Sequence, residues 1–444
     1  MSYHLVCGLE IHTELKTNSK MFCGCKNDPF GAPKPNIYTC PVCLGLPGAL
    51  PVANKKAIEW TIKLGLFLGC KINLDSKFDR KNYFYPDLPK SYQISQFDLP
   101  FCYAGHVDTD WGVVRINRIH LEEDTAKLLH QEIDGQKVTL IDFNRSSVPL
   151  IEIVTEPDII NSQQAKQYAK KIQEAVRLLG IGDADMQKGG MRLEANISLR
   201  DDQQVKNNQL PDYKVEVKNI NSFNFMGQAI DYEIKRQTRL LEAGEKIKQE
   251  TRGWDSVNNK TFLQRSKENA ADYRYFPDPD LPVVHFEPEQ IEAIRQTLPL
   301  THDAHLSAWE KDYGIEPKYG QKFMEKADQV AWADELWQQA KKDQLDPNKL
   351  ANFLANGKID YHSGETVAVI IERFRELTKV ASSSNDELTR VIDQVLRQNS
   401  AEVTRFQAGE KKLLGFFMGQ IMKAAGKKLD AAKVNQLLRQ QLQA

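Results

Sequence analysis

Cys23-Gly24-Cys25 and Cys40-Pro41-Val42-Cys43 are two closely spaced cysteine pairs near the start of the chain. Thiolate is a soft ligand, and four thiolates suit tetrahedral zinc. The alternative is that the four are unrelated buried cysteines. Because four of the seven cysteines fall between residues 23 and 43, we expect a structural zinc site formed by Cys23, Cys25, Cys40 and Cys43.

Acidic side chains and a histidine surround these pairs in the sequence. Glu10 and His12 are two residues apart in an expected strand, so their side chains share one face. Glu152 lies alone within the apolar run 150–154, where a buried carboxylate is costly without a cation or a hydrogen-bond partner. These three residues are therefore candidates for chemistry rather than for packing.

Three consecutive acids, Glu122, Glu123 and Asp124, repel one another unless a positive group lies among them. A magnesium ion would satisfy them together with Glu152, because it prefers carboxylate oxygens. The alternative is a salt-bridge network with the basic residues nearby, which are Arg115, Arg118 and Lys127. The residues alone leave both interpretations open.

The composition is that of an ordinary globular protein. The chain has 444 residues, of which 41% are hydrophobic and 27% are charged, and its net charge is −1. No apolar run reaches the ~18 residues of a membrane span, and no export signal follows Met1. Cys7, Cys70 and Cys102 stand singly in apolar contexts, which fits a reducing compartment. We therefore expect a cytoplasmic protein without membrane contact.

The pattern of secondary structure changes near residue 295. Before it, segments are short, rich in β-branched residues and broken by Pro, Gly, Asn and Asp. Strands are expected at 113–116, 137–143, 149–154 and 214–218. Helices are expected after Asn161, which would cap the first one, and from Asn224 to Leu241. The N-terminal part is thus predicted to be mixed α and β, with mostly antiparallel pairing.

After residue 295 amphipathic helical patterns dominate, and the polar stretch 382–386 is typical of a linker or a helix cap. Residues 401–444 carry a net charge of +5, from eight basic and three acidic residues. This basic tail is a candidate nucleic-acid contact. A solvated helical face explains the charge equally well.

Several well-known catalytic motifs are absent from the sequence. It contains neither a Gly-x-x-x-x-Gly-Lys-Ser/Thr phosphate loop nor a protein-kinase catalytic loop. It has no Gly-x-Ser-x-Gly elbow, and no cysteine stands where a glutaminase nucleophile would be credible. Any ATP would therefore have to be held by a metal ion and scattered basic residues.

Aromatic, amide and basic side chains are dense between Asp79 and Asp98. Such a surface can stack bases, bond sugar hydroxyls and pair phosphates, as the recognition of single-stranded RNA ends requires. Residues 272–280 have the same character. In both segments the alternative is a buried aromatic loop that packs on the core.

Several long motifs in register resemble the B subunit of the bacterial aspartyl/glutamyl-tRNA(Asn/Gln) amidotransferase, the GatB family. They cover residues 4–290 densely and return at 419–424 in the tail. The motifs are Gly8-Leu9-Glu10-Ile11-His12, the run from Cys40 to Gly48, residues 77–98, His120-Leu121-Glu122-Glu123-Asp124, residues 149–158, Glu194-Ala195-Asn196-Ile197-Ser198 and residues 273–282. The family usually has glycine where Ser147 stands.

The resemblance implies one component of a glutamine-hydrolysing aminoacyl-tRNA amidotransferase, which is a carbon–nitrogen ligase. Family members work with an amidase subunit and a small third subunit in a heterotrimer. The member of the GatB family transfers the γ-phosphoryl group of ATP to the side-chain carboxylate of Glu-tRNA(Gln), Asp-tRNA(Asn) or both. Ammonia from the amidase then displaces the phosphate. The implied cofactors are ATP and Mg²⁺, whose positive charge lets two anions react, beside the structural Zn²⁺.

The resemblance also implies roles for particular residues. It makes His12, Glu123 and Glu152 ligands of Mg²⁺, and with Glu10 these form the catalytic set. The residues that would hold the aminoacyl end of the tRNA are Lys81, Tyr83, Lys90, Tyr92, Gln93 and Arg274. The implied fold is α+β, with a mostly antiparallel catalytic cradle at 1–295, a helical domain at 296–375 and a helical tail at 376–444 that contacts tRNA.

Two other functions compete with this one. The first is a non-catalytic tRNA-binding scaffold that contains a structural zinc site. The second is a stand-alone metal hydrolase, which would turn over without partners or tRNA.

Overall fold

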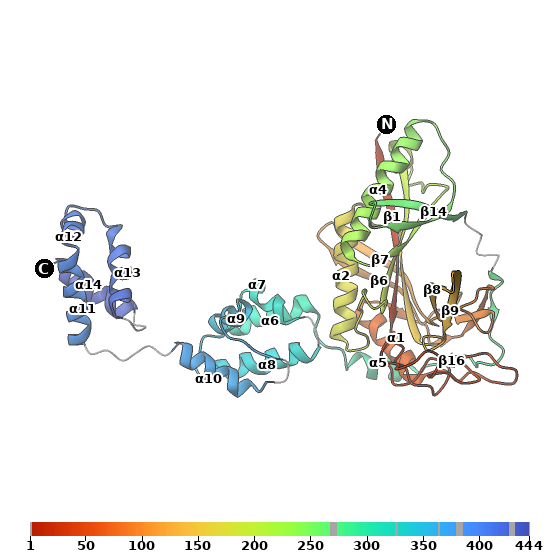
Figure 1. The fold of residues 1–444 in the computed structure, drawn as a ribbon, viewed down its shortest axis with the longest axis horizontal. Helices are drawn as coiled ribbons and strands as arrows, with labels where there is room; N and C mark the ends of the chain where they lie inside the picture. The colour runs from red at the N-terminus through yellow and green to blue at the C-terminus, as the bar shows by residue number, and fades with distance from the viewer. Residues whose placement is uncertain are drawn as a thin grey trace. The chain divides into compact units, whose positions relative to one another are not determined.

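The computed structural model describes residues 2–266, 273–324, 327–362, 365–378, 385–425 and 431–443. The chain divides into two compact units, Met1–Asp312 with Glu316–Ala331 and Tyr313–Ile315 with Trp332–Ala444 (Figure 1). Sheets form much of the first unit, and the second consists of helices, so the predicted α+β class is confirmed. The three-domain division at 295 and 375 stays a prediction.

A large, nearly all-antiparallel sheet forms the centre of the first unit. Its strands are β1 (Tyr3–Glu14), β2 (Lys71–Ile72), β6 (Cys102–Thr109), β7 (Gly112–Glu123), β10 (Pro149–Thr155), β11 (Met191–Asp201), β12 (Val215–Ile220), β13 (Glu250–Asp255) and β14 (Lys260–Ser266). They are ordered β14-β13-β12-β11-β1-β10-β7-β6-β2, and only the β12–β13 pair is parallel. The strands expected at 113–116, 149–154 and 214–218 are confirmed as parts of β7, β10 and β12.

Three helices pack on one face of this sheet: α1 (Lys55–Phe67), α2 (Ser162–Leu178) and α4 (Phe223–Glu242) (Figure 1). The expected cap of α2 is confirmed, because the Asn161 side chain accepts a hydrogen bond of 2.7 Å from the Gln164 backbone. A short helix, α3 (Asp202–Lys206), follows β11. Helix α1 approaches the sheet closely, since a Cβ on Gly65 would clash with the Cys102 sulfur.

The two faces of the sheet differ because side chains alternate along each strand. On β1, Leu9 and Ile11 are fully buried in the core beneath the helices. Glu10 and His12 therefore point to the opposite face. The same alternation turns Ile151 and Ile153 of β10 into the core, and Glu152 away from it. The face opposite the helices thus gathers acidic and imidazole groups.

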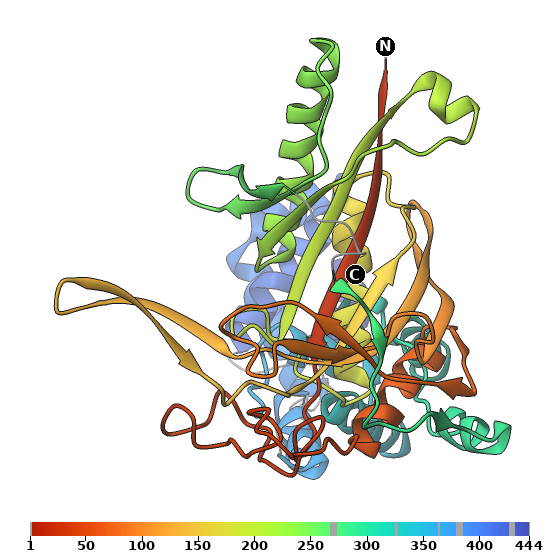
Figure 2. The same ribbon diagram turned by 90° about the vertical axis from the view of Figure 1, so that its right-hand side faces the viewer.

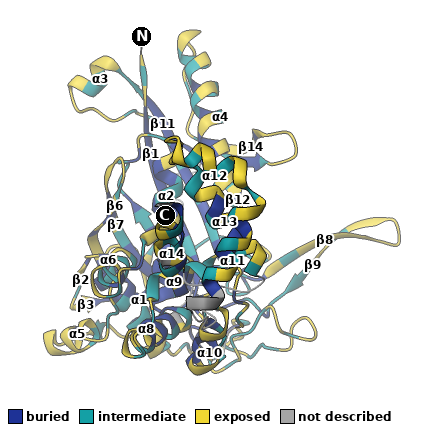
Figure 3. Ribbon diagram, turned by 90° about the vertical axis from the view of Figure 1, so that its left-hand side faces the viewer, coloured by how far each residue is buried: buried dark blue, intermediate teal, exposed yellow. Residues whose placement is uncertain are grey.

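Three smaller sheets complete the strands of the first unit. They are formed by β3 (Asp75–Ser76) with β16 (Val284–His285), by β4 (Asp79–Asn82) with β5 (Tyr92–Ser95) and β15 (Phe276–Pro277), and by β8 (Lys127–Ile133) with β9 (Gln136–Asp142). Pairing of β15 with β4 brings together the two aromatic segments. The β8–β9 hairpin extends away from the body (Figures 2 and 3), and the strand expected at 137–143 is confirmed as β9.

The rest of the chain is helical, as predicted. The helices are α5 (Pro288–Arg295), α6 (His302–Tyr313), α7 (Pro317–Gly320), α8 (Ala327–Lys342), α9 (Pro347–Ala355), α10 (Val367–Thr378), α11 (Asn385–Gln398), α12 (Ser400–Gln407), α13 (Leu413–Ala425) and α14 (Ala431–Gln443), with a 3-10 turn at Gln321–Phe323. The last four share an apolar core that includes Leu388, Phe417 and Leu438. Residues 382–384 of the expected linker, and Lys427 and Lys428 of the basic tail, lie outside the described residues.

No helix among the described residues is both long enough and apolar enough to cross a membrane.

Candidate metal and aminoacyl-end site

Three adjacent strands bring a row of ionisable side chains together on the polar face. The register places His12 of β1 opposite Glu152 of β10, and Glu152 opposite His120 of β7. Directly opposed residues in antiparallel strands have neighbouring side chains. Glu122 follows His120 by two residues and so points to the same face.

His12, Glu122 and Glu152 converge on a common point. His12 Nε2 lies 3.5 Å from Glu152 Oε2 and 3.8 Å from Glu122 Oε1. One ligand atom from each of the three lies within 4.8 Å of the others. Both carboxylates are almost fully buried, and buried carboxylates require a positive partner. Two carboxylate oxygens and one imidazole nitrogen are thus a donor set that fits a divalent cation.

The charges of this cluster depend strongly on one another. Burial disfavours the charged imidazole of His12, but Glu152 and other nearby carboxylates raise its pKa to about 9. Burial likewise opposes ionisation of Glu152, yet His120 and His12 hold the pKa of that carboxyl well below its usual range. The cluster therefore favours ionised carboxylates, which are the form that binds a metal, and His12 must release its proton when a metal binds.

Glu123 is not part of this group. It is the next residue of β7 after Glu122, so its side chain points the other way. There it accepts a hydrogen bond of 2.6 Å from Lys90 and one of 2.9 Å from the Ile94 backbone. The structure thus places Glu122, rather than the expected Glu123, beside His12 and Glu152. The alternation Ile119-His120-Leu121-Glu122 was the sequence signal that could have found both His120 and Glu122.

Glu10 belongs to a neighbouring acidic group with Glu194 and Glu216. Lys218 lies 2.8 Å from Glu194 and 3.8 Å from Glu216, and Asn196 donates a hydrogen bond of 2.7 Å to Glu10. Burial and the neighbouring carboxylates together raise the pKa of Glu10. Glu10 also lines a cavity of about 340 Å³ in the polar face. It is therefore near the cluster of His12 but not within it.

Lys81 and three tyrosines form the border of the site. The Lys81 ammonium lies 5.0 Å from the ring of Tyr273 and 6.0 Å from that of Tyr83. Burial lowers its pKa, but Tyr275, Glu122 and Glu152 more than offset this and raise it. Lys81 thus presents a permanent positive charge toward the two carboxylates.

Of the other expected substrate contacts, Lys90 and Gln93 are nearly buried and bonded to Glu123 within the fold, whereas Tyr92 and Arg274 are less buried. Gln93 donates a hydrogen bond of 2.7 Å to the Glu123 carbonyl, so it holds the end of β7. The Tyr92 ring lies under the Arg80 guanidinium at 4.3 Å. Arg274 lies 6.0 Å from the ring of Phe84, a side chain that is 76% exposed. The structure therefore leaves an aromatic and cationic surface open to solvent beside the cluster.

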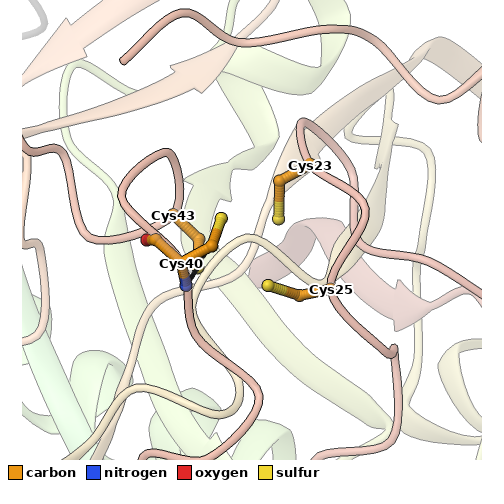
Figure 4. A group of neighbouring side chains, drawn as sticks. All are labelled: Cys23, Cys25, Cys40 and Cys43. Carbon is orange, nitrogen blue, oxygen red and sulfur yellow. Dashed lines mark hydrogen bonds between the residues drawn. The ribbon is translucent and has the colours of Figure 1, made fainter. Parts of the chain in front are cut away.

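The four cysteines form a separate group (Figure 4). Sulfur atoms of Cys23, Cys25, Cys40 and Cys43 lie within 4.8 Å of one another, and none is in a disulfide. The Cys40 backbone donates a hydrogen bond of 3.2 Å to the Cys43 sulfur, and the buried Lys20 ammonium lies 3.9 Å from it. The pKa of the Cys43 thiol is lowered to about 5, and its hydrogen bond with Cys23 is the largest cause. Four thiols in this arrangement fit the structural zinc site predicted from their spacing.

Ser147 links the cysteine segment to the acidic strand end. Its backbone donates a hydrogen bond of 2.9 Å to the Asp124 carbonyl and accepts one of 2.7 Å from Met21. Its φ angle is +67°, a left-handed conformation that favours glycine. A glycine at this position would adopt that conformation without strain.

Two family models match most of the chain, one after the other. Residues 5–292 match the GatB/GatE catalytic domain, and residues 338–442 match the GatB domain. The chain belongs to the GatB family.

Full-length relatives carry a common name. A protein of Thermodesulfovibrio yellowstonii is 42% identical over 482 residues and covers 99% of both chains. A protein of Persephonella marina is 40% identical over 486 residues and covers 100% of both, and one of Geobacter sp. is 41% identical over 488 residues with the same coverage. Each is named as the B subunit of aspartyl/glutamyl-tRNA(Asn/Gln) amidotransferase.

Proposed function

We propose that this chain is the component of a tRNA-dependent amidotransferase that activates the side-chain carboxylate of Glu-tRNA(Gln), Asp-tRNA(Asn) or both. Activation is phosphorylation by ATP, and ammonia then displaces the phosphate to leave the amide. Full-length membership of the GatB family supports this role within a glutamine-hydrolysing ligase. The observation that carries the catalytic proposal is the convergence of His12, Glu122 and Glu152.

His12, Glu122 and Glu152 would hold Mg²⁺, with Glu122 in the place expected of Glu123. When bound, the ion supplies positive charge between the anionic phosphate and the anionic carboxylate. The Lys81 ammonium adds a second positive charge on the border of the same site. These cations reduce the repulsion that otherwise keeps two anions apart.

The aromatic and cationic border would hold the aminoacyl end of the tRNA. Tyr83 and Lys81 lie next to the carboxylates, and Arg274 and Phe84 extend the same surface into solvent. Rings and guanidinium planes stack on unpaired bases, and ammonium groups pair with phosphates. An RNA terminus bound to this border would have its bases and phosphates at the exposed end and its amino acid at the cluster.

The proposed partner subunits supply a glutaminase activity for which the sequence shows no nucleophile. With no glutaminase nucleophile of its own, the chain requires ammonia from an amidase subunit, and we propose that a small third subunit completes a heterotrimer. The zinc at the cysteine group is structural in this proposal, and residues 376–444 contact the tRNA. We also infer a cytoplasmic location, because none of the seven cysteines, all of which the structure describes, forms a disulfide.

Replacing Glu152 with glutamine in the assembled complex tests the catalytic proposal. We expect ATP cleavage that depends on aminoacyl-tRNA to fall at least ~100-fold, the lower range for removing an electrostatic catalytic group. Binding of the tRNA should be unchanged. Glu132→Gln, on the exposed β8–β9 hairpin, is the matched control and should retain activity.

Two results would favour the competing functions. Undiminished ATP cleavage in the Glu152→Gln complex, with tRNA binding unchanged, would refute the catalytic proposal and favour the scaffold function. Turnover by the isolated chain, without tRNA or partners, would identify a stand-alone hydrolase.

A further inference from the structure

His120 is a second buried imidazole at the cluster of His12, Glu122 and Glu152. Its side chain is only 4% exposed, and its Nε2 atom lies 3.0 Å from Glu152 Oε2 and 3.6 Å from Glu122 Oε2. We propose that His120 is a positioning residue that donates a hydrogen bond to Glu152 and fixes both carboxylates for the metal, without binding the metal itself. This inference rests on the proposed metal site.

The geometry assigns the donor to His120. An ionised carboxylate can only accept hydrogen bonds, so the proton between Glu152 and His120 must be carried by Nε2 of the imidazole. The opposite ring nitrogen, Nδ1, is buried and finds no partner within the described part of the chain. Among the described residues, the polar contacts of the ring are therefore those that Nε2 makes with Glu152 and Glu122.

The same geometry argues against His120 as a ligand. Among the described residues, the group whose donor atoms converge within 4.8 Å contains His12, Glu122 and Glu152 but not His120. Nε2 of His120 is already at hydrogen-bond distance from Glu152. A nitrogen that carries a proton has no lone pair for a metal.

Strand pairing makes this contact rigid. His120 lies directly opposite Glu152 in the β7–β10 register, and neither residue is at the end of its strand. The carboxylates of Glu122 and Glu152 repel each other, and His120 lies within 3.6 Å of both. It therefore holds them in place before any metal arrives. Loss of such an outer partner typically weakens metal binding ~10–100-fold.

Two variants of the full chain test this role. In His120→Gln the side-chain amide can replace the Nε2 donor, whereas His120→Leu has a similar size and no donor. His130→Leu, on the exposed strand β8, is the matched control. Calorimetric titration with Mn²⁺ as the probe should show ~10–100-fold weaker binding for His120→Leu, near-normal binding for His120→Gln, and no change for the control.

Pulsed electron paramagnetic resonance of the bound Mn²⁺ separates positioning from ligation. We expect one directly coupled nitrogen in the wild type, which His12→Ala removes and His120→Gln retains. Two coupled nitrogens in the wild type would overturn the inference, and this result does not depend on how well a variant folds. Unchanged Mn²⁺ affinity in His120→Leu would overturn it too. A wild-type chain that binds no Mn²⁺ would instead refute the proposed metal site.

Discussion

Replacement of Glu122 or Glu123 by glutamine should affect metal binding differently, although the residues are adjacent in the sequence. Glu122 lies in the cluster with His12 and Glu152, whereas Glu123 is paired with Lys90 on the other side of the strand. We expect Glu122→Gln to lose metal-dependent function, and also some stability because its buried carboxylate contacts His12, His120 and Ser95. We expect Glu123→Gln to lose stability and keep metal binding.

The size of each effect follows from burial. The Lys90 and Glu123 side chains are 10% and 3% exposed and lie 2.5 Å apart. Breaking a buried ion pair by removing one partner costs about 3–5 kcal/mol. Glutamine still accepts the hydrogen bond from the Ile94 backbone, so we expect the lower end, about 3 kcal/mol. The Glu122 carboxylate would lie a few ångströms from the cation. At about 4 Å and an effective dielectric constant of about 20, the attraction between two opposite unit charges is about 4 kcal/mol. Its loss should weaken metal binding at least ~100-fold, or about 3 kcal/mol.

Three measurements on both variants decide the matter. Urea unfolding of the full chain gives the free energy of unfolding, Mn²⁺ calorimetry gives metal affinity, and the assembled complex gives tRNA-dependent ATP cleavage. If Glu123→Gln loses Mn²⁺ affinity while Glu122→Gln retains it, the assignment of the cluster is refuted.

Three further changes have definite expected outcomes. Cys43→Ser should lower the zinc content of the purified chain and its thermal unfolding midpoint, because only three thiolates remain, and a strong chelator should do the same to the wild type. Ser147→Gly should raise the free energy of unfolding by about 1 kcal/mol in urea, since it removes a left-handed serine and a buried hydroxyl without a partner among the described residues. Burial opposes ionisation of Asp158, but Arg115 more than offsets this and holds its pKa below the usual value. Asp158→Asn should therefore destabilise the chain at neutral pH, and the difference should vanish as the pH falls below about 4.

Contrary results would be informative in each case. Full zinc content in Cys43→Ser would show that this thiol is not a ligand. A less stable Ser147→Gly would mean that glycine's entropy in the unfolded chain outweighs the strain. The pKa of Asp158 is lower in the folded chain than in the unfolded chain, so its ionised carboxylate stabilises the fold at any pH above the unfolded pKa. This stabilisation is lost as the pH falls and the carboxyl group of the folded chain takes up a proton. A pH-independent difference would therefore remove the ion pair as the cause.

Local chemistry in the sequence determined the secondary structure and the thiol group. The Asn161 cap, the helical spacing that follows it and the β-branched run at Pro149–Thr155 each specify an element through interactions a few residues long. The cysteine pairs are equally local, because each lies within one tight turn. Such features need no knowledge of the rest of the fold.

The membership of the catalytic cluster was decided by the tertiary structure. Every residue at the end of β7 is buried, from Ile119 to Glu123. Burial alone therefore does not distinguish the side chains that face the cluster from those on the other side of the strand. Alternation groups His120 with Glu122, but only the register of β7 on β10 and β10 on β1 places them beside Glu152 and His12. The register of β10 on β1 depends on contacts between residues more than a hundred positions apart. A motif read along the chain therefore identifies candidate ligands, while the pairing of distant strands selects the ones that meet.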